Sequence, residues 1–436
     1  MDLTPVVDLD DEESCDGHRY GAGMQSLFLR LVLGGSSLRG AARVLTMLAE
    51  SLGWLMPTPH WTTGRLWLLR LGHAMLTVAK EQAEDWAWLI DHSVQIGQEK
   101  CLVILGIRLR NMPPPGQCLA HADLELIALI PRKSWTRQEV DEALEAATQK
   151  TGVPRVIVDD HGVDINGGVV FFQERHQHTA EIYDAKHKAA CLLKARLEKN
   201  PRWQEFQKQL AQTRCAIQQT ELGFLVPPGP RPKARFMNLA AILQWASNVQ
   251  RVLREPPAVV RERVRPERLQ EKLGWLREFA AALAEWSEWQ EIMDVMVAFV
   301  NRYGVFRGAA AKLRTELRRH STHASSLILT KELVAFVAQQ GRQTKPGERF
   351  PGSTEVLESC FGRFKQLEKQ QARGGFTSLL LGFGALLADT TTKVIKDAME
   401  HSPTKKIYRW CNQYLGTTLF GQRKLAFAAQ QKPDEN

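Results

Sequence analysis

Three apolar segments in the first third of the chain, each short enough to be a β-strand, constrain the fold most strongly. The first occupies residues 86–90 and runs into Asp91. The second and third occupy residues 101–109 and 124–130. Apolar runs of this length, separated by turn residues, are typical of strands. The sequence therefore predicts a meander of three strands in this region.

A helix and a fourth strand follow the meander. Residues 136–150 have helical spacing, and Thr136 followed by Glu139 predicts a capping box at the start of that helix. Residues 156–158 are Val-Ile-Val without alternation, which predicts a strand that is buried on both faces. This order of elements predicts an α/β fold built on a mixed sheet.

Three acidic residues occupy matching places in this order. Asp91 ends the first apolar run, Asp160 follows the fourth strand 69 residues later, and Glu358 lies on a late helix 198 residues further on. Phosphodiester chemistry with two metal ions needs carboxylates that converge on one point, so that the attacking and leaving oxygens are held in line. Mg²⁺ prefers oxygen ligands and keeps several waters, so two or three acids suffice. The triplet therefore predicts a site for two Mg²⁺ or Mn²⁺ ions.

Neighbouring acids compete for two of these roles. Asp159 directly precedes Asp160, and adjacent side chains of a strand point to opposite faces, so only one of the two can face the site. Glu355 lies about one turn before Glu358 on the same helix face and is the alternative third acid. Lys365 lies seven residues after Glu358, almost two turns, and is predicted to hold a phosphate beside the metal site.

At these residues the chain resembles bacterial insertion-sequence transposases of the DDE class. The resemblance rests on WLIDHSVQIG around Asp91, VIVDDHGVDINGGV around Asp160, STEVLESCFGRFK around Glu358, and EIYDAKHKAACLLKARLEKNPRWQEF between the last two. It covers most of the chain and implies a ribonuclease H-like core in which these three acids hold the metal ions. It also implies binding of terminal inverted repeats, DNA cleavage, strand transfer, and a homodimer or larger assembly on DNA. Some of these families have a Y-x2-R-x3-E pattern, where this chain has Pro351 and Thr354.

The residues before the first strand have the pattern of a helix-turn-helix domain. Residues 24–33 and 37–52 have helical spacing, and residues 60–76 form a third such segment after a proline-containing break. In this motif the last helix lies in the major groove of DNA while the preceding helix braces it. The side chains predicted to contact DNA are Thr62, Thr63, Arg65 and Arg70. The apolar face predicted for the second helix comprises Leu38, Ala41, Val44, Leu45 and Leu48. An ordinary three-helix bundle has the same pattern.

Helical periodicity dominates residues 199–348, so an all-helical insertion is predicted between the fifth strand and the last helix of the catalytic fold. Its basic runs, residues 231–235 and 312–319, are suited to track phosphates, and solvated helix faces have the same composition. The predicted phosphate contacts of the second run are Lys312, Arg318 and Arg319. Four tryptophans of the insertion, at positions 245, 275, 286 and 289, are predicted to pack in its core, because large aromatic side chains dominate such cores.

The predicted fold is therefore a ribonuclease H-like mixed sheet interrupted by a helical insertion, with an N-terminal helix-turn-helix domain. In chain order the predicted segments are an acidic tail (1–20), the helix-turn-helix domain (21–84), the first core segment (85–198), the insertion (199–348), the second core segment (349–425) and a tail (426–436).

Composition is compatible with a DNA-binding protein. The formal net charge is +9, but the first twenty residues carry seven acids against one arginine, so the remainder carries +15. A basic body favours a polyanionic partner such as double-stranded DNA. The seven cysteines are scattered and never spaced as CxxC, which is typical of free thiols in a reducing compartment. With no apolar leader and no apolar stretch long enough to span a bilayer, the sequence predicts a cytoplasmic protein without membrane partners.

Two other functions are consistent with the same residues. A transposase-derived regulator would bind DNA without cutting it, and its acids would be relics or fold determinants. A ribonuclease H-like nuclease would act on RNA hybrids or junctions, although a helix-turn-helix module, which reads duplex DNA, argues against that substrate. Among the histidines near the acids, His92 and His187 are predicted to be structural, whereas His161 is placed to touch the scissile phosphate.

Overall fold

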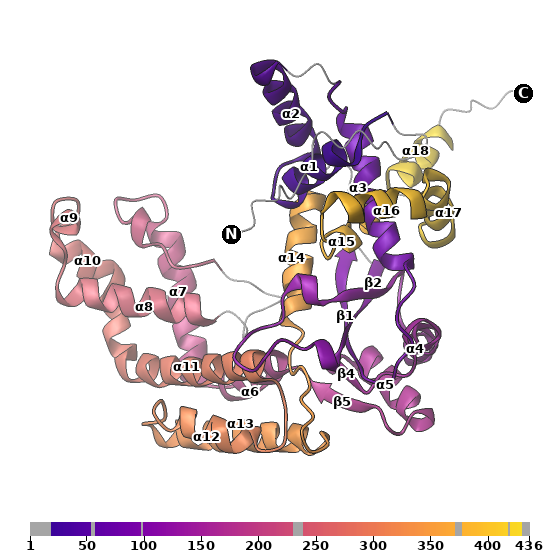
Figure 1. The fold of residues 1–436 in the computed structure, drawn as a ribbon. Coiled ribbons are helices and arrows are strands. Elements are labelled where there is room, and N and C mark those ends of the chain that lie inside the picture. Colours follow the sequence, from indigo (N-terminus) through magenta and orange to yellow (C-terminus); the bar gives the residue numbers. More distant parts are fainter. Residues whose placement is uncertain are drawn as a thin grey trace, which may run out of the picture. The chain divides into compact units, whose positions relative to one another are not determined.

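A computed structural model describes residues 19–53, 57–96, 99–229, 239–370, 377–416 and 419–429 (Figure 1). Of the acidic tail predicted for residues 1–20, all but residues 19 and 20 lie outside the described residues. The basic run at 231–235 lies wholly outside them.

The chain divides into two compact units. The first, here called the α/β unit, comprises Met1–Pro113, Leu119–Glu181 and Thr354–Asn436. The second, here called the helical unit, comprises Pro114–Cys118 and Ile182–Ser353. The helical unit thus begins 17 residues before the predicted start of the insertion at residue 199, and it also includes a short segment from the loop after the second strand.

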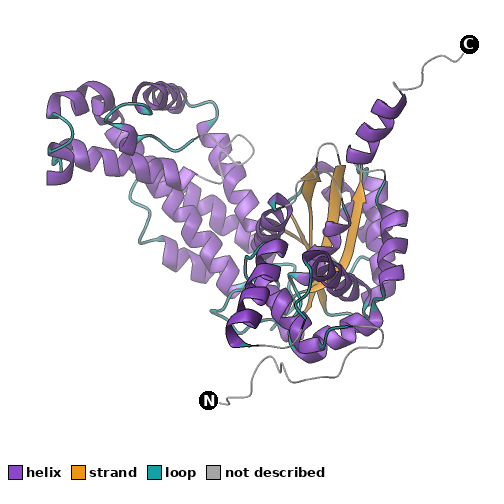
Figure 2. Cartoon of the chain, turned by 90° about the horizontal axis from the view of Figure 1, so that it is seen from above, coloured by secondary structure: helices purple, strands orange, loops and turns teal. Residues whose placement is uncertain are grey.

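A five-stranded sheet forms the centre of the α/β unit (Figure 2). The strands are β1 (Trp86–Ile96), β2 (Glu99–Arg108), β3 (Glu125–Arg132), β4 (Val156–Asp159) and β5 (Ala180–Tyr183). Their order in the sheet is β3-β2-β1-β4-β5. The meander pairs antiparallel, whereas β4 pairs parallel to β1. The predicted meander of three strands, the fourth strand and the mixed sheet are confirmed.

One face of the sheet is covered by α4 (Arg137–Thr151) and α5 (Val163–Arg175). Trp88 of β1 and Phe172 of α5 pack there with their ring centroids 6.1 Å apart. The capping box of α4 is confirmed, since the backbone N–H of Thr136 donates to Glu139 and the N–H of Glu139 donates to Thr136 Oγ1. This apolar layer fixes the direction in which alternate side chains of β1 and β4 point.

Helices also cover the opposite face. They include α3 (Trp61–Thr77) and α15 (Gly382–Ala385), which pack closely against each other, and α14 (Glu355–Lys369), which packs against β1. The close approach of α3 to the chain before α15 requires glycine at position 72, because a Cβ there would lie 1.7 Å from the carbonyl oxygen of Leu381. Figure 2 shows the strands of this unit between helices on both sides.

The two helices before α3 are α1 (Ala22–Leu33) and α2 (Leu38–Leu52). Ser37 caps α2 by accepting a hydrogen bond from the backbone N–H of Gly40 at 2.9 Å. The apolar face predicted for α2 is partly wrong. Its buried side chains are Ala41, Leu45 and Ala49. Val44 and Leu48 are 36% and 38% exposed, because the neighbouring helices contact α2 along a different stripe.

Two 3₁₀ turns, Leu109–Asn111 and His121–Asp123, lie between β2 and β3, and further elements of the α/β unit follow α14. They are a 3₁₀ turn at Ser378–Leu381, α15, α16 (Thr392–His401), α17 (Thr404–Tyr414) and α18 (Leu419–Ala429). The apolar segment Leu379–Leu387 is buried and includes the end of the 3₁₀ turn and α15.

Apart from the end of β5 and a single bridge between Val305 and Phe350, the regular structure of the described helical unit is helical. Its longer helices are α6 (Ala185–Leu197), α7 (Pro201–Ile217), α8 (Leu239–Arg254), α11 (Ala280–Tyr303), α12 (Ala309–Leu317) and α13 (Ala324–Gly341). The shorter ones are two 3₁₀ segments (Gly223–Leu225 and Gly274–Phe279), α9 (Ala258–Arg261) and α10 (Pro266–Leu273). Among the described helices of both units, none combines the length and apolar character needed to cross a bilayer.

Aromatic side chains form the core of the helical unit. Trp203 and Trp286 meet edge to face with their ring centroids 4.9 Å apart. Trp289 is also buried. Trp245 and Trp275 are half-buried, and their indole N–H groups donate to Leu225 O and Thr213 Oγ1, both at 2.9 Å. These contacts confirm that the tryptophans of the insertion pack in its interior.

Candidate functional site

The acids predicted from the sequence on β1 and after β4 lie at one end of that strand pair. Asp91 is half-buried and pairs with Val103 of β2. Side chains alternate along a strand, so Asp91 lies on the same face as Leu89 and opposite the face where Trp88 and Ile90 meet α4 and α5. Helix α14, which carries the third predicted acid, also packs against β1.

Asp159 and Asp160 differ in burial and in the face of the sheet on which they lie, because one ends β4 and the other follows it. Asp159 is the last residue of β4 and is fully buried. By alternation its side chain lies on the face of Ile157, which packs with α4 and α5. Asp160 follows the strand, is half-buried, and accepts a hydrogen bond from the backbone N–H of Gly162 at 2.8 Å. The two neighbouring acids therefore have different surroundings.

The third acid lies on α14. Glu355 and Glu358 both belong to its first turn and are both half-buried, so exposure does not separate these two candidates. Lys365 lies further along the same helix and is exposed. Carboxylates that solvent can reach are suited to hold a hydrated cation such as Mg²⁺, and Asp91, Asp160 and Glu358 have this character.

The structure brings together a different set of ligand atoms. Among the described residues, the group whose metal-ligating atoms all lie within 4.8 Å of one another consists of Asp159, His161 and Glu181, and such a group could hold a metal ion. His161 Nε2 lies 3.2 Å from Glu181 Oε1, and the amide of Asn166 donates to the same oxygen at 2.7 Å. The predicted set of Asp91, Asp160 and Glu358 does not converge to this degree.

Electrostatics distinguish the two carboxyl groups of this set. Burial, together with the negative charge of Glu181, raises the pKa of Asp159 well above its ordinary value. For Glu181, burial acts in the same direction, but hydrogen bonds from His161 and Asn166 outweigh it and lower the pKa. A neutral Asp159 beside an ionised Glu181 is the arrangement that these shifts favour.

Sequence reasoning misses Glu181 because its role depends on β5 lying beside β4. The residue opens the segment EIYDAKHK, but only the sheet order brings it to Asp159. The imidazole of His161, which the sequence predicts to touch the scissile phosphate, lies beside Glu181. Its backbone has φ 58°, the left-handed region that is uncommon outside glycine and asparagine.

His92, which the sequence predicts to be structural, packs beside Trp135. Its imidazole is buried, lies 5.2 Å from the Trp135 ring, and faces the carboxylate of Asp164 at 3.7 Å. Burial lowers its pKa, although the negative charges of Asp164 and Asp160 oppose the shift. Lys100 of β2 also approaches Asp164, at 3.8 Å, and its side chain is 42% exposed. It is a cation beside the candidate site that the sequence does not indicate.

The prediction that Arg70 is available to DNA is wrong. Its side chain is 7% exposed, and its guanidinium donates to the backbone carbonyls of Ser402 and Met399. Arg65 is half-buried and donates to Ser378 Oγ at 2.6 Å. Most of α3 is therefore an internal helix of the α/β unit. Thr62 at its first turn is exposed, and Thr63 is half-buried.

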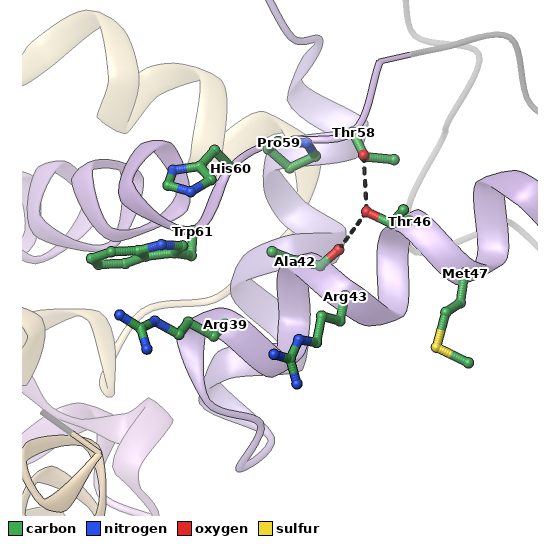
Figure 3. Close-up of a pocket in the computed structure, with 9 residues that line it drawn as sticks. All are labelled: Arg39, Ala42, Arg43, Thr46, Met47, Thr58, Pro59, His60 and Trp61. Atoms are coloured by element: carbon green, nitrogen blue, oxygen red, sulfur yellow. Dashed lines mark hydrogen bonds between the residues drawn. The ribbon is translucent and has the colours of Figure 1, made fainter.

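An exposed basic groove lies instead between α2 and the start of α3 (Figure 3). Arg39 and Arg43, one turn apart, leave α2 on the same side, and the Arg39 guanidinium lies 5.0 Å from the centroid of the Trp61 ring. Thr46 and Thr58 join their hydroxyls at 3.1 Å across the groove. Within the described residues 19–53 and 57–77, the sequence has a single acid, Glu50, so this surface is positively charged.

The helical unit carries its own basic surface. Lys312, Arg318 and Arg319 are all exposed, and the Lys312 ammonium lies 5.2 Å from the centroid of the Phe306 ring. Their exposure is compatible with the predicted phosphate contacts.

The chain matches no family model, and no curated protein matches it.

Proposed function

We propose that the chain is a DNA transposase of the DDE class, with a ribonuclease H-like core formed by the α/β unit. The observation that carries the proposal is the register of β1 and β4. Residues 87, 88 and 89 pair with residues 156, 157 and 158, a constant offset of 69. Asp91 and Asp160 have the same offset, so continuing the register places them side by side at the end of the strand pair.

Glu358 is the third acid in this proposal. Its helix packs against β1, the strand that carries Asp91. Together the three carboxylates would hold two Mg²⁺ or Mn²⁺ ions, which supply charge neutralisation and an activated water when bound. Lys365 and Lys100 are exposed cations on neighbouring elements and are suited to hold non-reacting phosphates.

The reaction has two stages. In the first, a water oxygen attacks the phosphorus at the element end, the P–O3′ bond breaks, and a 3′-hydroxyl is released. In the second, that 3′-hydroxyl attacks a phosphodiester of the target, a new P–O bond forms, and the target's own 3′-oxygen leaves. The chain's contribution is to position the reacting groups and to stabilise negative charge that develops on the phosphate oxygens. In this proposal the protein acts on double-stranded DNA as a dimer or larger assembly.

The test is a magnesium-dependent cleavage assay on the DNA that flanks the gene. We expect cutting at the element ends by the intact protein and a loss of about 10³-fold or more in Asp91→Ala and Glu358→Ala, with binding to the same DNA retained. Glu355→Ala is the matched control, since it lies in the same helical turn with similar exposure. Manganese serves as the alternative ion in every arm.

Three outcomes would contradict the proposal in different ways. Full activity in Asp91→Ala would exclude the site. Loss in Glu355→Ala with activity in Glu358→Ala would move the third acid by one turn. Binding of the ends by the intact protein without cutting, in either metal, would favour the regulator, and cutting confined to RNA hybrids would favour the nuclease.

A further inference from the structure

A second cluster of metal-ligating side chains lies beside the proposed catalytic acids but on the other face of the sheet. Asp159 ends β4, His161 belongs to the turn that follows, and Glu181 lies on the neighbouring strand β5. Their ligand atoms, two carboxylate oxygens and an imidazole nitrogen, lie within 4.8 Å of one another. Alternation along the strands separates this cluster from Asp91.

Asp159 has an oxygen that the protein leaves without a donor. The side chain is fully buried, and its Oδ1 accepts the backbone N–H of His161 at 2.6 Å. No N–H or O–H group of the described residues reaches Oδ2. The neighbouring polar group is the carboxyl of Glu181, with which Asp159 forms a hydrogen bond when one of the two carboxyl groups is protonated. Buried acceptors are almost always satisfied, so this oxygen calls for a cation or a shared proton.

The other two ligands are held in place. Glu181 Oε1 accepts from the Asn166 amide at 2.7 Å, and Asn166 belongs to α5. His161 is kept in the left-handed backbone region, and its ring is directed at Glu181. A non-glycine residue in that region stores strain that the surrounding structure must maintain, and such strain is concentrated at ligand sites. The cluster is therefore preorganised, which lowers the free energy needed to order it around an ion.

We propose that Asp159, His161 and Glu181 bind one divalent transition-metal ion of the zinc class, separate from the ions of the catalytic acids. The donor set supports this choice, because one imidazole and two carboxylates suit Zn²⁺ or Co²⁺ better than Mg²⁺, which prefers oxygen ligands alone. Three protein ligands leave a position for water. The ion would tie β4 to β5 and fix the turn that carries Asp160.

The test uses the full chain with Asp91→Ala and Glu358→Ala, so that the proposed catalytic ligands are absent. Zn²⁺ is titrated by calorimetry, and Co²⁺ by its visible absorption, with Zn²⁺ as competitor. We expect one ion per chain, and a Zn²⁺-dependent rise in melting temperature. Adding His161→Ala or Glu181→Gln should weaken binding at least about 100-fold and abolish that rise.

A matched variant and a folding check control the result. His178→Ala removes an exposed histidine from the segment before β5, and it should bind Zn²⁺ like its parent. Asp159→Asn removes a proposed ligand while preserving the shape of the side chain, and circular dichroism establishes that it and the other variants are folded. Absence of Zn²⁺ and Co²⁺ binding in the parent, or binding unchanged in Asp159→Asn and Glu181→Gln, would show that the cluster holds only a shared proton. None of these readouts depends on DNA cleavage.

Discussion

The two units bury carboxylates in opposite ways. In the helical unit, Glu288 of α11 accepts hydrogen bonds from the Thr322 hydroxyl at 2.5 Å and from the backbone N–H of His323 at 3.0 Å. Burial alone would raise its pKa, but these donors lower it to about 2. In the α/β unit, Asp159 has one donor and an acidic neighbour, and its pKa is raised.

The difference lies both in the donors and in the depth of burial, since Asp159 is fully buried and Glu288 is half-buried. A carboxylate surrounded by N–H and O–H groups holds helices together and has little capacity left for a ligand. Two carboxyl groups that face each other can share a proton or bind a cation. The comparison therefore contrasts Glu288, whose carboxylate has donors within its own unit, with Asp159, which has a single N–H donor and an acidic neighbour.

The largest effect should come from a substitution at the close approach of α3 to the chain before α15. In Gly72→Ala the new Cβ would meet the Leu381 carbonyl oxygen at 1.7 Å, and backbone cannot move aside as a flexible side chain can. We expect destabilisation of more than about 4 kcal/mol. Hydrogen exchange should show lost protection in α3 and retained protection in α11. Gly362→Ala, where a Cβ meets nothing within 4 Å on α14, should be neutral or stabilise by up to about 1 kcal/mol.

Acid should weaken the two units in different pH ranges. Burial lowers the pKa of His73 to about 4, with the charge of Lys406 adding to the shift. The unfolded chain binds that proton near pH 6.5, so this stability of the α/β unit is complete above pH 6.5 and falls, by up to about 3 kcal/mol, toward pH 4. For Glu288 the folded pKa lies below the unfolded one. Its contribution is complete above about pH 4.5 and is lost as the pH falls through about 2.

Denaturant melts of His73→Gln and Glu288→Gln between pH 7.5 and 2.5 measure these ranges. His73→Gln should remove the decline between pH 6.5 and 4, and Glu288→Gln should differ most from the intact protein above pH 4.5. Identical pH profiles for the intact protein and both variants would contradict the assignment of these two pH ranges to His73 and Glu288.

The smallest expected effect is on DNA binding, and it distinguishes the basic surface of the α/β unit from that of the helical unit. Replacing Arg39 and Arg43 by alanine should weaken binding to element-end DNA about 10-fold to 100-fold and reduce the salt dependence, since each removes a cation that displaces counterions. The matched variant replaces Arg318 and Arg319 in the helical unit. Fluorescence anisotropy at several salt concentrations measures both. A larger loss in the second variant would assign the main DNA surface to the helical unit.

Features with local causes can be predicted from the sequence. The strands follow from apolar runs, and the start of α4 follows from Thr136 and Glu139, whose capping contacts lie three residues apart. The burial of Arg70 could not be predicted, because the carbonyls that it binds lie more than 300 residues away in sequence. The buried face of α2 could not be predicted for the same reason. Helical periodicity identifies apolar stripes but does not show which stripe the neighbouring helices cover.

The candidate site shows the same limit. Asp91 and Asp160 can be found because each ends an apolar run, and the register of β1 and β4 then agrees with their spacing. Glu181 cannot be found in this way because it does not end an apolar run, and it meets Asp159 through the order of the strands and Asn166 through a separate helix.

The interruption of the α/β unit by residues 182–353 also has a consequence for synthesis. A ribosome delivers the chain from its N-terminus, and domains generally fold as they emerge. Asp91 and Asp160 therefore leave the ribosome well before α14, and the whole helical unit is made in between. If Glu358 completes the site, a nascent chain cannot cut DNA until almost all of it has been translated. The order of the units along the gene would then delay the proposed cleavage activity until the helical unit has been synthesised.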